Sequence, residues 1–187
     1  MNQLIAITIA VFAAATITTE SADLTADQII EKANLAAYYS GKDGKAKVKM
    51  TIVDKNGAKR VREFVILRLN EKKGGDQKFY VYFNAPADVR KMAYLVWKKV
   101  GEGKDDDRWL WLPAMNLVKR IAPGDKRTSF VGSDFVYEDV SGRSTTADKH
   151  ELIKSDGDLY QIRNTPKEKG VTFKYYDVWI DKKTFLP

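Results

Sequence analysis

Few side chains in this sequence have the types and spacing that carry out catalysis. The only histidine, His150, lies beside Glu151 in a predicted strand, with no nucleophile motif near it. The residues Gly-Ser-Asp at 132–134 lack the Gly-x-Ser-x-Gly spacing of a nucleophile elbow. The aspartates at 105–107 lack the spaced oxygen ligands of a calcium loop, and a solvated turn explains them better. We therefore expect no enzymatic activity, no metal and no other cofactor.

The aromatic residues suggest a different chemistry, which is the binding of an apolar ligand. Trp109 and Trp111 are two positions apart in a predicted strand, so both rings lie on the same face of it. Large rings on the inner face of a sheet suit acyl chains, and we predict that these two line the wall of a cavity. For any single ring, the alternative is a place in the ordinary core. The other candidates for the cavity are Phe79, Trp97, Phe130, Phe135 and Tyr137, the last three in a segment that could close over its mouth.

Basic residues flank that segment and are candidates for binding a headgroup or a partner. Lys119, Arg120, Lys126 and Arg127 would suit a lipid phosphate or an acidic docking surface. The alternative is that they are solvated surface. In that case, the acidic residues within 134–139 cap a helical turn or pair with the first two of these cations.

Length and composition favour one globular domain with its own core. The chain has 187 residues, of which 44% are hydrophobic, and its formal net charge is +7. A basic surface attracts nucleic acid, anionic lipid or an acidic protein without choosing among them. The sequence has no cysteine, which excludes disulfides, cysteine-ligated zinc and the lipobox cysteine of a lipoprotein.

The first 22 residues are typical of a secretory signal. An uncharged apolar run at 4–15 precedes a short polar stretch that ends at Ala22, and we predict a signal peptide at 1–22. Its removal takes away only one charged side chain, Glu20, and leaves a domain at 23–187 with a net charge of +8. Cleavage after Ala15 fits the small-residue rule better. An uncleaved anchor is the other alternative, although the run is shorter than the ~20 residues of a spanning helix. Export to the periplasm would exclude nucleic acid as a partner.

One helix and about nine strands must position these side chains. Thr25 and Gln28 have the spacing of a capping box, which predicts a helix over about 25–39 with an apolar stripe on one face. The Asn56-Gly57 turn predicts an antiparallel hairpin of residues 46–54 and 59–70. Further strands are predicted at 78–83, 92–100, 108–112, 117–121, 148–154, 158–164 and 171–181, while 133–140 could be a helical turn or an irregular loop.

This element order predicts an α+β fold. We expect a strongly curved antiparallel sheet, or half-open β-barrel, with the N-terminal helix packed on its concave side. A wide curved sheet cannot fill its interior with its own side chains. The space between the sheet and the helix would therefore form a cavity for an apolar ligand.

Residues 109–140 resemble the signature of the LolA-like outer-membrane lipoprotein-sorting family, within the LolA/LolB/RseB-like superfamily. The resemblance rests on an aromatic strand ending in Leu-Pro at 112–113, a basic strand at 117–121, and a Gly-Ser-Asp-Phe segment that ends in Tyr-Glu-Asp at 137–139. It extends over residues 23–187 as a single domain. Family members carry additional C-terminal strands, so we expect this chain to lack the last ones. A glycine is usual in the family where this chain has Lys91.

The resemblance implies a periplasmic carrier. Such a protein binds lipoprotein acyl chains or another lipid in its cavity and delivers them toward the outer membrane. Its partners would be an inner-membrane transporter of the resistance-nodulation-division type and an outer-membrane acceptor. The alternative is a lipid-sensing or transporter-accessory domain of the same fold that docks on a membrane protein without carrying cargo.

Overall fold

The computed structural model describes residues 23–187, and the predicted signal peptide lies outside these described residues. Within them, no helix is both long enough and apolar enough to cross a membrane. The elements are α1 Ala26–Tyr38, β1 Asp43–Val53, β2 Lys59–Asn70, β3 Gln77–Ala85, β4 Ala93–Lys98, β5 Asp107–Leu112, β6 Leu117–Ile121, β7 Asp148–Asp156, β8 Leu159–Pro166 and β9 Tyr176–Asp181, with short 3₁₀ helices at Pro113–Met115, Pro123–Asp125, Tyr137–Val140 and Thr145–Ala147.

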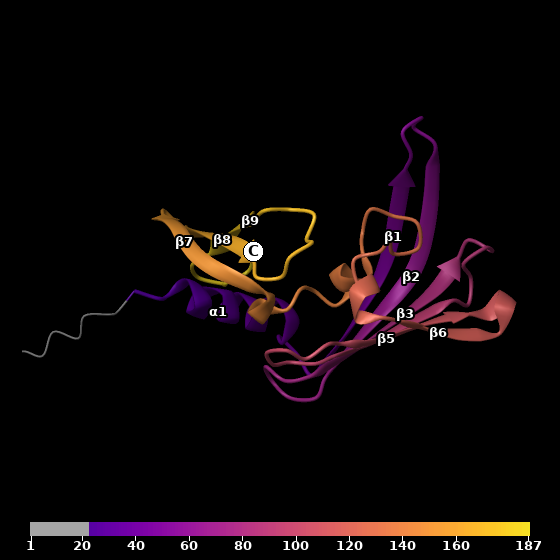
Figure 1. Ribbon diagram of the computed structural model, residues 1–187, viewed down its shortest axis with the longest axis horizontal. Helices are drawn as coiled ribbons and strands as arrows, with labels where there is room; N and C mark the ends of the chain where they lie inside the picture. Colours follow the sequence, from indigo (N-terminus) through magenta and orange to yellow (C-terminus); the bar gives the residue numbers. More distant parts are fainter. Residues whose placement is uncertain (1–22) are drawn as a thin grey trace, which may run out of the picture.

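Strands β1 to β6 form one antiparallel meander in sequence order, and the sheet curves strongly without closing into a barrel (Figure 1). The α+β class and the curved sheet are therefore confirmed. The predicted hairpin is formed by β1 and β2, because Asp54 Oδ1 accepts hydrogen bonds from the backbone N–H groups of Asn56 and Ala58. Gly57 completes this turn with a φ of 83°, a conformation that glycine adopts without strain.

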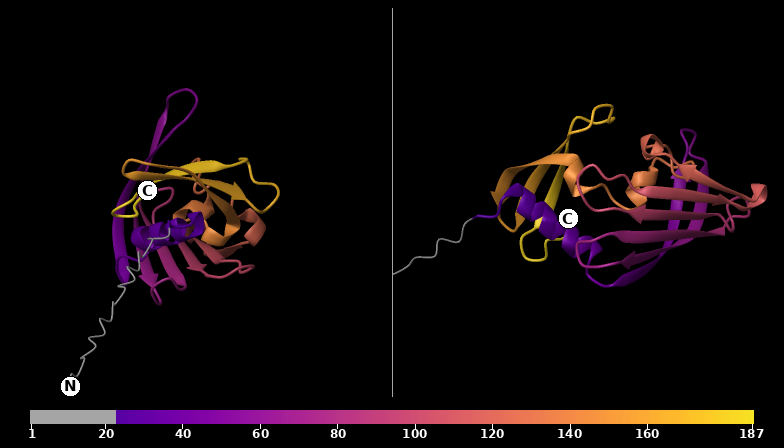
Figure 2. Two further views of the ribbon diagram at one scale, coloured as in Figure 1. Left: turned by 90° about the vertical axis from the view of Figure 1, so that its left-hand side faces the viewer. Right: turned by 60° about the horizontal axis from the view of Figure 1, so that its bottom comes forward.

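Strands β7 to β9 form a second, three-stranded sheet, and the helix packs on this smaller sheet (Figure 2). The capping box of Thr25 and Gln28 is present as predicted. However, Ile29 is fully buried against Ile162 and Ile180, so the helix does not lie along the concave side of the large sheet. The prediction was wrong on this point because amphipathicity requires a partner for the helix but does not identify it.

The C-terminal end of α1 joins the two halves of the molecule. Tyr39 donates a hydrogen bond from its hydroxyl to the carbonyl oxygen of Gly75, at 2.6 Å. The carbonyl of Tyr38 accepts hydrogen bonds from the side chains of Asn70 and Gln77, which are buried at the end of the large sheet. Because side-chain amides satisfy the backbone where the helix ends, the helix is fixed to both sheets.

Residues 122–147, which we call the covering segment, begin inside the curve of the large sheet and then cross to the start of β7 (Figure 1). Phe130 is 3% exposed, and the centroid of its ring is 5.6 Å from that of Tyr94 and 5.7 Å from that of Tyr137. The ambiguous stretch 133–140 contains an isolated bridge between Ser129 and Val136, followed by the 3₁₀ helix Tyr137–Val140. The covering segment thus completes the main hydrophobic core.

The turn between β3 and β4 keeps a conformation suited to glycine although it contains none. Lys91 has a φ of 69°, in the left-handed region. Its backbone N–H donates to the carbonyl of Phe83 at 2.9 Å, and this bond holds the turn. The lysine at this position therefore leaves the turn intact, at some cost in backbone strain.

Candidate functional site

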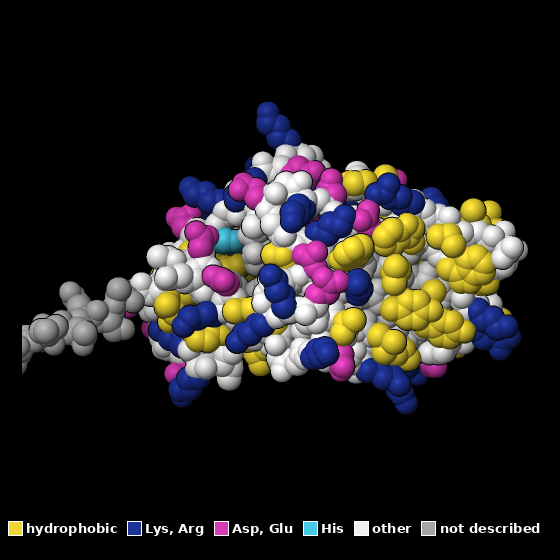
Figure 3. Space-filling model, turned by 90° about the horizontal axis from the view of Figure 1, so that it is seen from below, with side chains coloured by type: hydrophobic (Ala, Val, Ile, Leu, Met, Phe, Trp, Pro, Cys, Tyr) yellow, Lys and Arg dark blue, Asp and Glu magenta, His cyan; other side chains and the backbone are white. Residues whose placement is uncertain are grey.

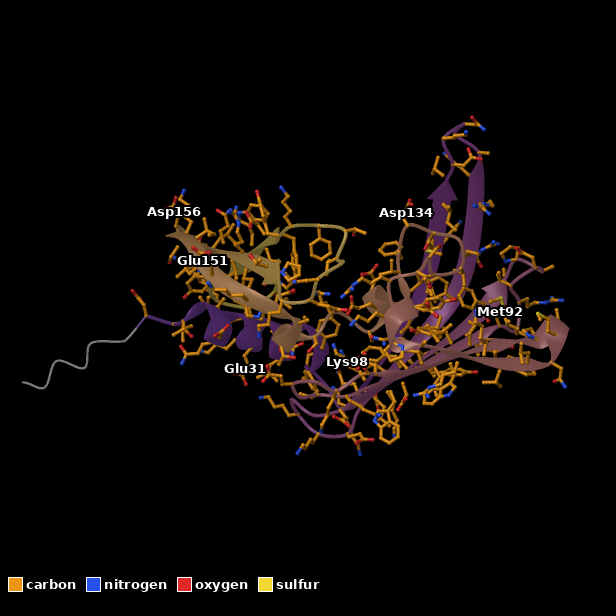
Figure 4. The ribbon with its side chains drawn as sticks, in the orientation of Figure 1. Glu31, Met92, Lys98, Asp134, Glu151 and Asp156 are labelled. Carbon is orange, nitrogen blue, oxygen red and sulfur yellow. The ribbon has the colours of Figure 1, made fainter. Side chains whose placement is uncertain are left out.

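A pocket of about 420 Å³ lies between the β1–β2 hairpin and the covering segment. Figure 4 shows this arrangement, with Asp134 on the covering segment opposite the hairpin. Most of the side chains that line the pocket are apolar. The complete set of lining residues is Val48, Lys49, Met50, Thr51, Phe64, Ile66, Phe130, Phe135, Asp139 and Val140.

The strand alternation of β1 and β2 builds the sheet side of this pocket. Val48 and Met50 are two residues apart, so both point to the concave side. The register of the hairpin places Val48 opposite Phe64, which points the same way. The sequence predicted this hairpin, but we did not assign these residues to a ligand site. The signal was available, because the Asn-Gly turn fixes the cross-strand partners.

Two charged residues, Asp139 and Lys49, are among those that line the pocket. The carboxylate of Asp139 accepts a hydrogen bond from the backbone N–H of Val136 at 2.8 Å, which fixes the start of the 3₁₀ helix. Lys49 is exposed, and because it alternates with Val48 and Met50, its side chain points away from the concave side. The pocket therefore combines an apolar wall with few polar groups, an arrangement typical of sites for small apolar ligands.

Four of the predicted cavity residues are in or beside the pocket. Phe130 forms part of its inner wall, and Phe135 lies on its lining while remaining 58% exposed. Phe79 and Tyr137 are buried in the adjoining core instead, at 4% and 8% exposed. The covering segment thus contributes both of the predicted aromatic residues that line the pocket.

The three tryptophans among the predicted cavity residues do not line this pocket. The sheet has an inner face, which carries Val96 and Leu110 toward the core, and an outer face on the convex side. Trp97, Trp109 and Trp111 alternate with those core residues and therefore point to the outer face. Alternation showed correctly that Trp109 and Trp111 share a face. Alternation alone does not show which face of the sheet another segment packs against.

The predicted basic cluster is not brought together as a free site. Lys119 and Arg120 are adjacent in β6, so they point to opposite faces, and Arg120 pairs with Asp107 at 2.7 Å. Lys126 and Arg127 both pair with a residue that sequence reasoning did not single out, Glu168, at 3.4 and 2.6 Å.

A second cavity, of about 500 Å³, lies between the covering segment and the segment that leads into β9. A buried ionic network lies beside it, in which Arg143 holds both carboxylate oxygens of Asp148, at 2.8 and 2.7 Å. Tyr176 donates to the same carboxylate at 2.9 Å, and burial followed by this negative charge raises its pKa well above the ordinary range. These interactions attach the covering segment to the small sheet.

A buried lysine supports the covering segment from the large sheet. Lys98, whose position Figure 4 marks near the junction of the two halves, donates to the carbonyl of Ser141 at 2.8 Å and to that of Gly142 at 3.2 Å. It is 6% exposed, and burial lowers its pKa to about 8. Its amine therefore holds two backbone carbonyls that would otherwise lack partners.

The residues with catalytic potential are held in structural contacts. Both ring nitrogens of His150 are hydrogen-bonded, one to Asn164 at 2.7 Å and the other to the carbonyl of Thr145 at 2.8 Å. The hydroxyl of Ser133 donates to the carbonyl of Phe130 at 2.7 Å and stabilises a turn. Within residues 23–187, no group of three or more acidic or histidine side chains is arranged to hold a metal.

Comparison with known proteins places this geometry in a family. No curated protein sequence matches the chain. A family model with the description "-like: Uncharacterized protein" matches residues 75–187, more than half of the chain. The chain belongs to this family.

Two solved structures show that the fold is LolA-like. One is a domain described as an outer membrane lipoprotein-sorting protein from Vibrio parahaemolyticus, with a TM-score of 0.74 and 27% sequence identity. The match covers 87% of this chain and 68% of the Vibrio chain. The other is a DUF1329 family protein from Desulfovibrio piger, with a TM-score of 0.72 and 29% sequence identity. The match covers 84% of this chain and 68% of the Desulfovibrio chain. In this LolA-like fold, the covering segment and the β1–β2 hairpin enclose the candidate site.

Proposed function

We propose that this protein is a non-enzymatic periplasmic carrier that holds the acyl chains of a lipoprotein, or another lipid, and delivers them toward the outer membrane. The observation that carries the proposal is the apolar pocket of about 420 Å³ on the concave side of the sheet. Its size falls in the range of about 300 to 1,000 Å³ that is usual for small-ligand sites. The likeness to a lipoprotein-sorting domain supports lipid as the class of cargo.

Transfer would depend on relative burial. Each methylene that the pocket shields from water stabilises the complex by about 0.8 kcal/mol. An acyl chain would therefore leave only for an acceptor that shields it equally well. Phe135, at 58% exposed, lies where it could cover or release the chain without disturbing the core. An inner-membrane transporter of the resistance-nodulation-division type would load the carrier, and an outer-membrane acceptor would unload it.

Filling the pocket tests the proposal. Val48→Trp places a large ring in the pocket, whereas Val53→Trp makes the same change on the same strand at a position that is 54% exposed and outside the pocket. The protein is isolated from the periplasm of its own host, and its bound lipid is identified by native mass spectrometry. We expect bound lipid in the unaltered protein and in Val53→Trp, and little or none in Val48→Trp. Equal lipid content in the two variants would contradict the proposal.

A transfer assay separates the carrier from the sensing alternative. The loaded protein is mixed with acceptor vesicles that contain the purified outer-membrane acceptor of the same host. A carrier passes its lipid to these vesicles. Retention of the lipid, together with a stable complex on a membrane protein whose affinity changes with lipid, would instead identify a lipid-sensing accessory domain.

A further inference from the structure

The outer face of the large sheet carries an exposed patch of aromatic and aliphatic side chains. Tyr80 lies opposite Leu95, and Trp111 lies opposite Val118, so the patch is continuous from β3 to β6. Tyr80 is 38% exposed, Leu95 39% and Val118 59%. We call these residues, together with Trp97 and Trp109, the outer patch. Figure 3 shows apolar side chains gathered over this part of the molecule.

Two lysines lie beside Trp97, at one edge of the outer patch. The ammonium of Lys78 lies 5.0 Å from the ring centroid of Trp97, and that of Lys99 lies 5.6 Å from it. Each of these lysines also pairs with a carboxylate, Lys78 with Glu71 at 2.8 Å and Lys99 with Asp107 at 2.6 Å. The positive charge that favours an anionic surface is therefore mainly that of the whole chain, whose formal net charge is +7.

We infer that the outer patch is a docking surface for an anionic lipid bilayer. Tryptophan and tyrosine rings prefer the boundary between water and hydrocarbon, because one end of each ring system is apolar and the other is polar. Lysines next to them can extend their ammonium groups toward anionic headgroups while their stems remain on apolar surface. The composition and the sign of the charge therefore both complement an anionic membrane surface.

The hairpin between β5 and β6 extends the outer patch. Met115 is 67% exposed at its tip. Apolar side chains at a tip enter the headgroup region with little rearrangement of the fold. The pocket opens on the other face of the sheet, so docking in this way leaves it accessible. This inference concerns a different surface from the proposed carrier site and does not depend on it.

Vesicle binding by the purified protein tests the inference. The probes are vesicles of phosphatidylcholine alone and of phosphatidylcholine mixed with phosphatidylglycerol. We expect binding only to the anionic vesicles, weakened by salt. We also expect a blue shift of the tryptophan fluorescence, because three of the four tryptophans, Trp97, Trp109 and Trp111, belong to the outer patch.

Two matched double variants show whether the outer patch is responsible. Leu95→Glu with Val118→Glu changes the outer patch, and Ile153→Glu with Leu159→Glu makes equivalent changes on the small sheet, where these residues are 40% and 43% exposed. Each pair adds two negative charges to exposed positions, and thermal unfolding confirms that both variants are folded. We expect the first pair to weaken vesicle binding about tenfold or more and the second to change it little.

Three results would overturn the inference. One is the absence of binding to anionic vesicles. Another is an equal loss in both double variants, which would show that only net charge matters. The third is self-association through the outer patch without vesicle binding, seen as a concentration-dependent dimer that the Leu95→Glu, Val118→Glu pair abolishes. Lipid retained in the pocket under any of these results would leave the carrier proposal standing.

Discussion

The two faces of the six-stranded sheet are made by the same strands but have different environments. On β3, Phe79 is 4% exposed toward the inner face, while its neighbour Tyr80 is 38% exposed on the outer face. On β4, Val96 is fully buried and Trp97 is 37% exposed. Both faces are rich in apolar side chains, so composition does not distinguish them. The difference arises because the covering segment packs its aromatic residues on the inner face alone.

This comparison shows that an apolar sheet face becomes core only where another segment supplies a partner. The inner face gains Phe130, which contacts the rings of Phe64, Phe83 and Tyr94, with centroids 5.6 to 6.2 Å apart. The pocket remains where this cover is incomplete, next to the β1–β2 hairpin. The outer face lacks such a partner among residues 23–187 and keeps its rings in contact with solvent.

The largest expected effect comes from truncating neighbouring rings on the two faces. Phe79→Ala should lower the free energy of unfolding by about 3 to 5 kcal/mol, because it leaves a cavity in a packed core. Tyr80→Ala should lower it by about 1 kcal/mol or less, because the ring is already partly in water. Urea unfolding of both variants checks this. Similar losses would mean that the outer face is as tightly packed as the inner one.

The next effect concerns the ionic attachment of the covering segment. Arg143→Met leaves the carboxylate of Asp148, which is 1% exposed, without its bidentate partner. We expect a loss of about 3 kcal/mol in the free energy of unfolding. Arg163→Met removes a similar bidentate pair with Asp177 at the surface and should have a much smaller effect. An equal loss in the two variants would show that burial of the Arg143 pair is unimportant.

A smaller effect should appear when pH is changed, because the inner face buries one lysine. The pKa of Lys98 is about 8 in the folded protein, and its ordinary value is 10.5. Between about pH 8 and 10, the amine is therefore mostly neutral in the folded protein and mostly protonated in the unfolded chain. The free energy of unfolding should therefore rise with pH, by roughly 2 kcal/mol over this interval relative to Lys98→Met. Urea titrations at both pH values measure the difference. Parallel pH profiles for the two proteins would contradict the burial of this amine.

The smallest effect concerns the turn between β3 and β4, which belongs to neither face. Lys91→Gly should raise the free energy of unfolding by up to about 1 kcal/mol, because glycine adopts the positive φ of 69° without steric conflict. Lys91→Ala keeps the Cβ atom and should give no such gain. Thermal unfolding of the two variants tests this, and a gain in both would point to removal of the charge instead.

Much of the fold could be predicted because local signals are strong in this chain. The capping box at Thr25 and Gln28 marks the start of the helix, and the Asn56-Gly57 turn fixes the first hairpin. The candidate site was predicted less well. Period-two alternation groups Trp109 with Trp111, but the covered face depends on where Phe130 packs, which is a tertiary contact. The partner of the helix is likewise tertiary, and so is the pairing of Arg127 with Glu168 across 41 positions.

We propose that the inner pocket holds the acyl chain, whereas the outer patch contacts only the surface of a bilayer. A photoreactive fatty acid, with its reactive group near the end of the chain, is bound to the protein, activated by light, and mapped by peptide mass spectrometry. The account predicts adducts on residues 48–51 and 130–140, which line the pocket. Adducts confined to the outer patch at Tyr80, Leu95 or Trp111, with the pocket residues unlabelled, would contradict it.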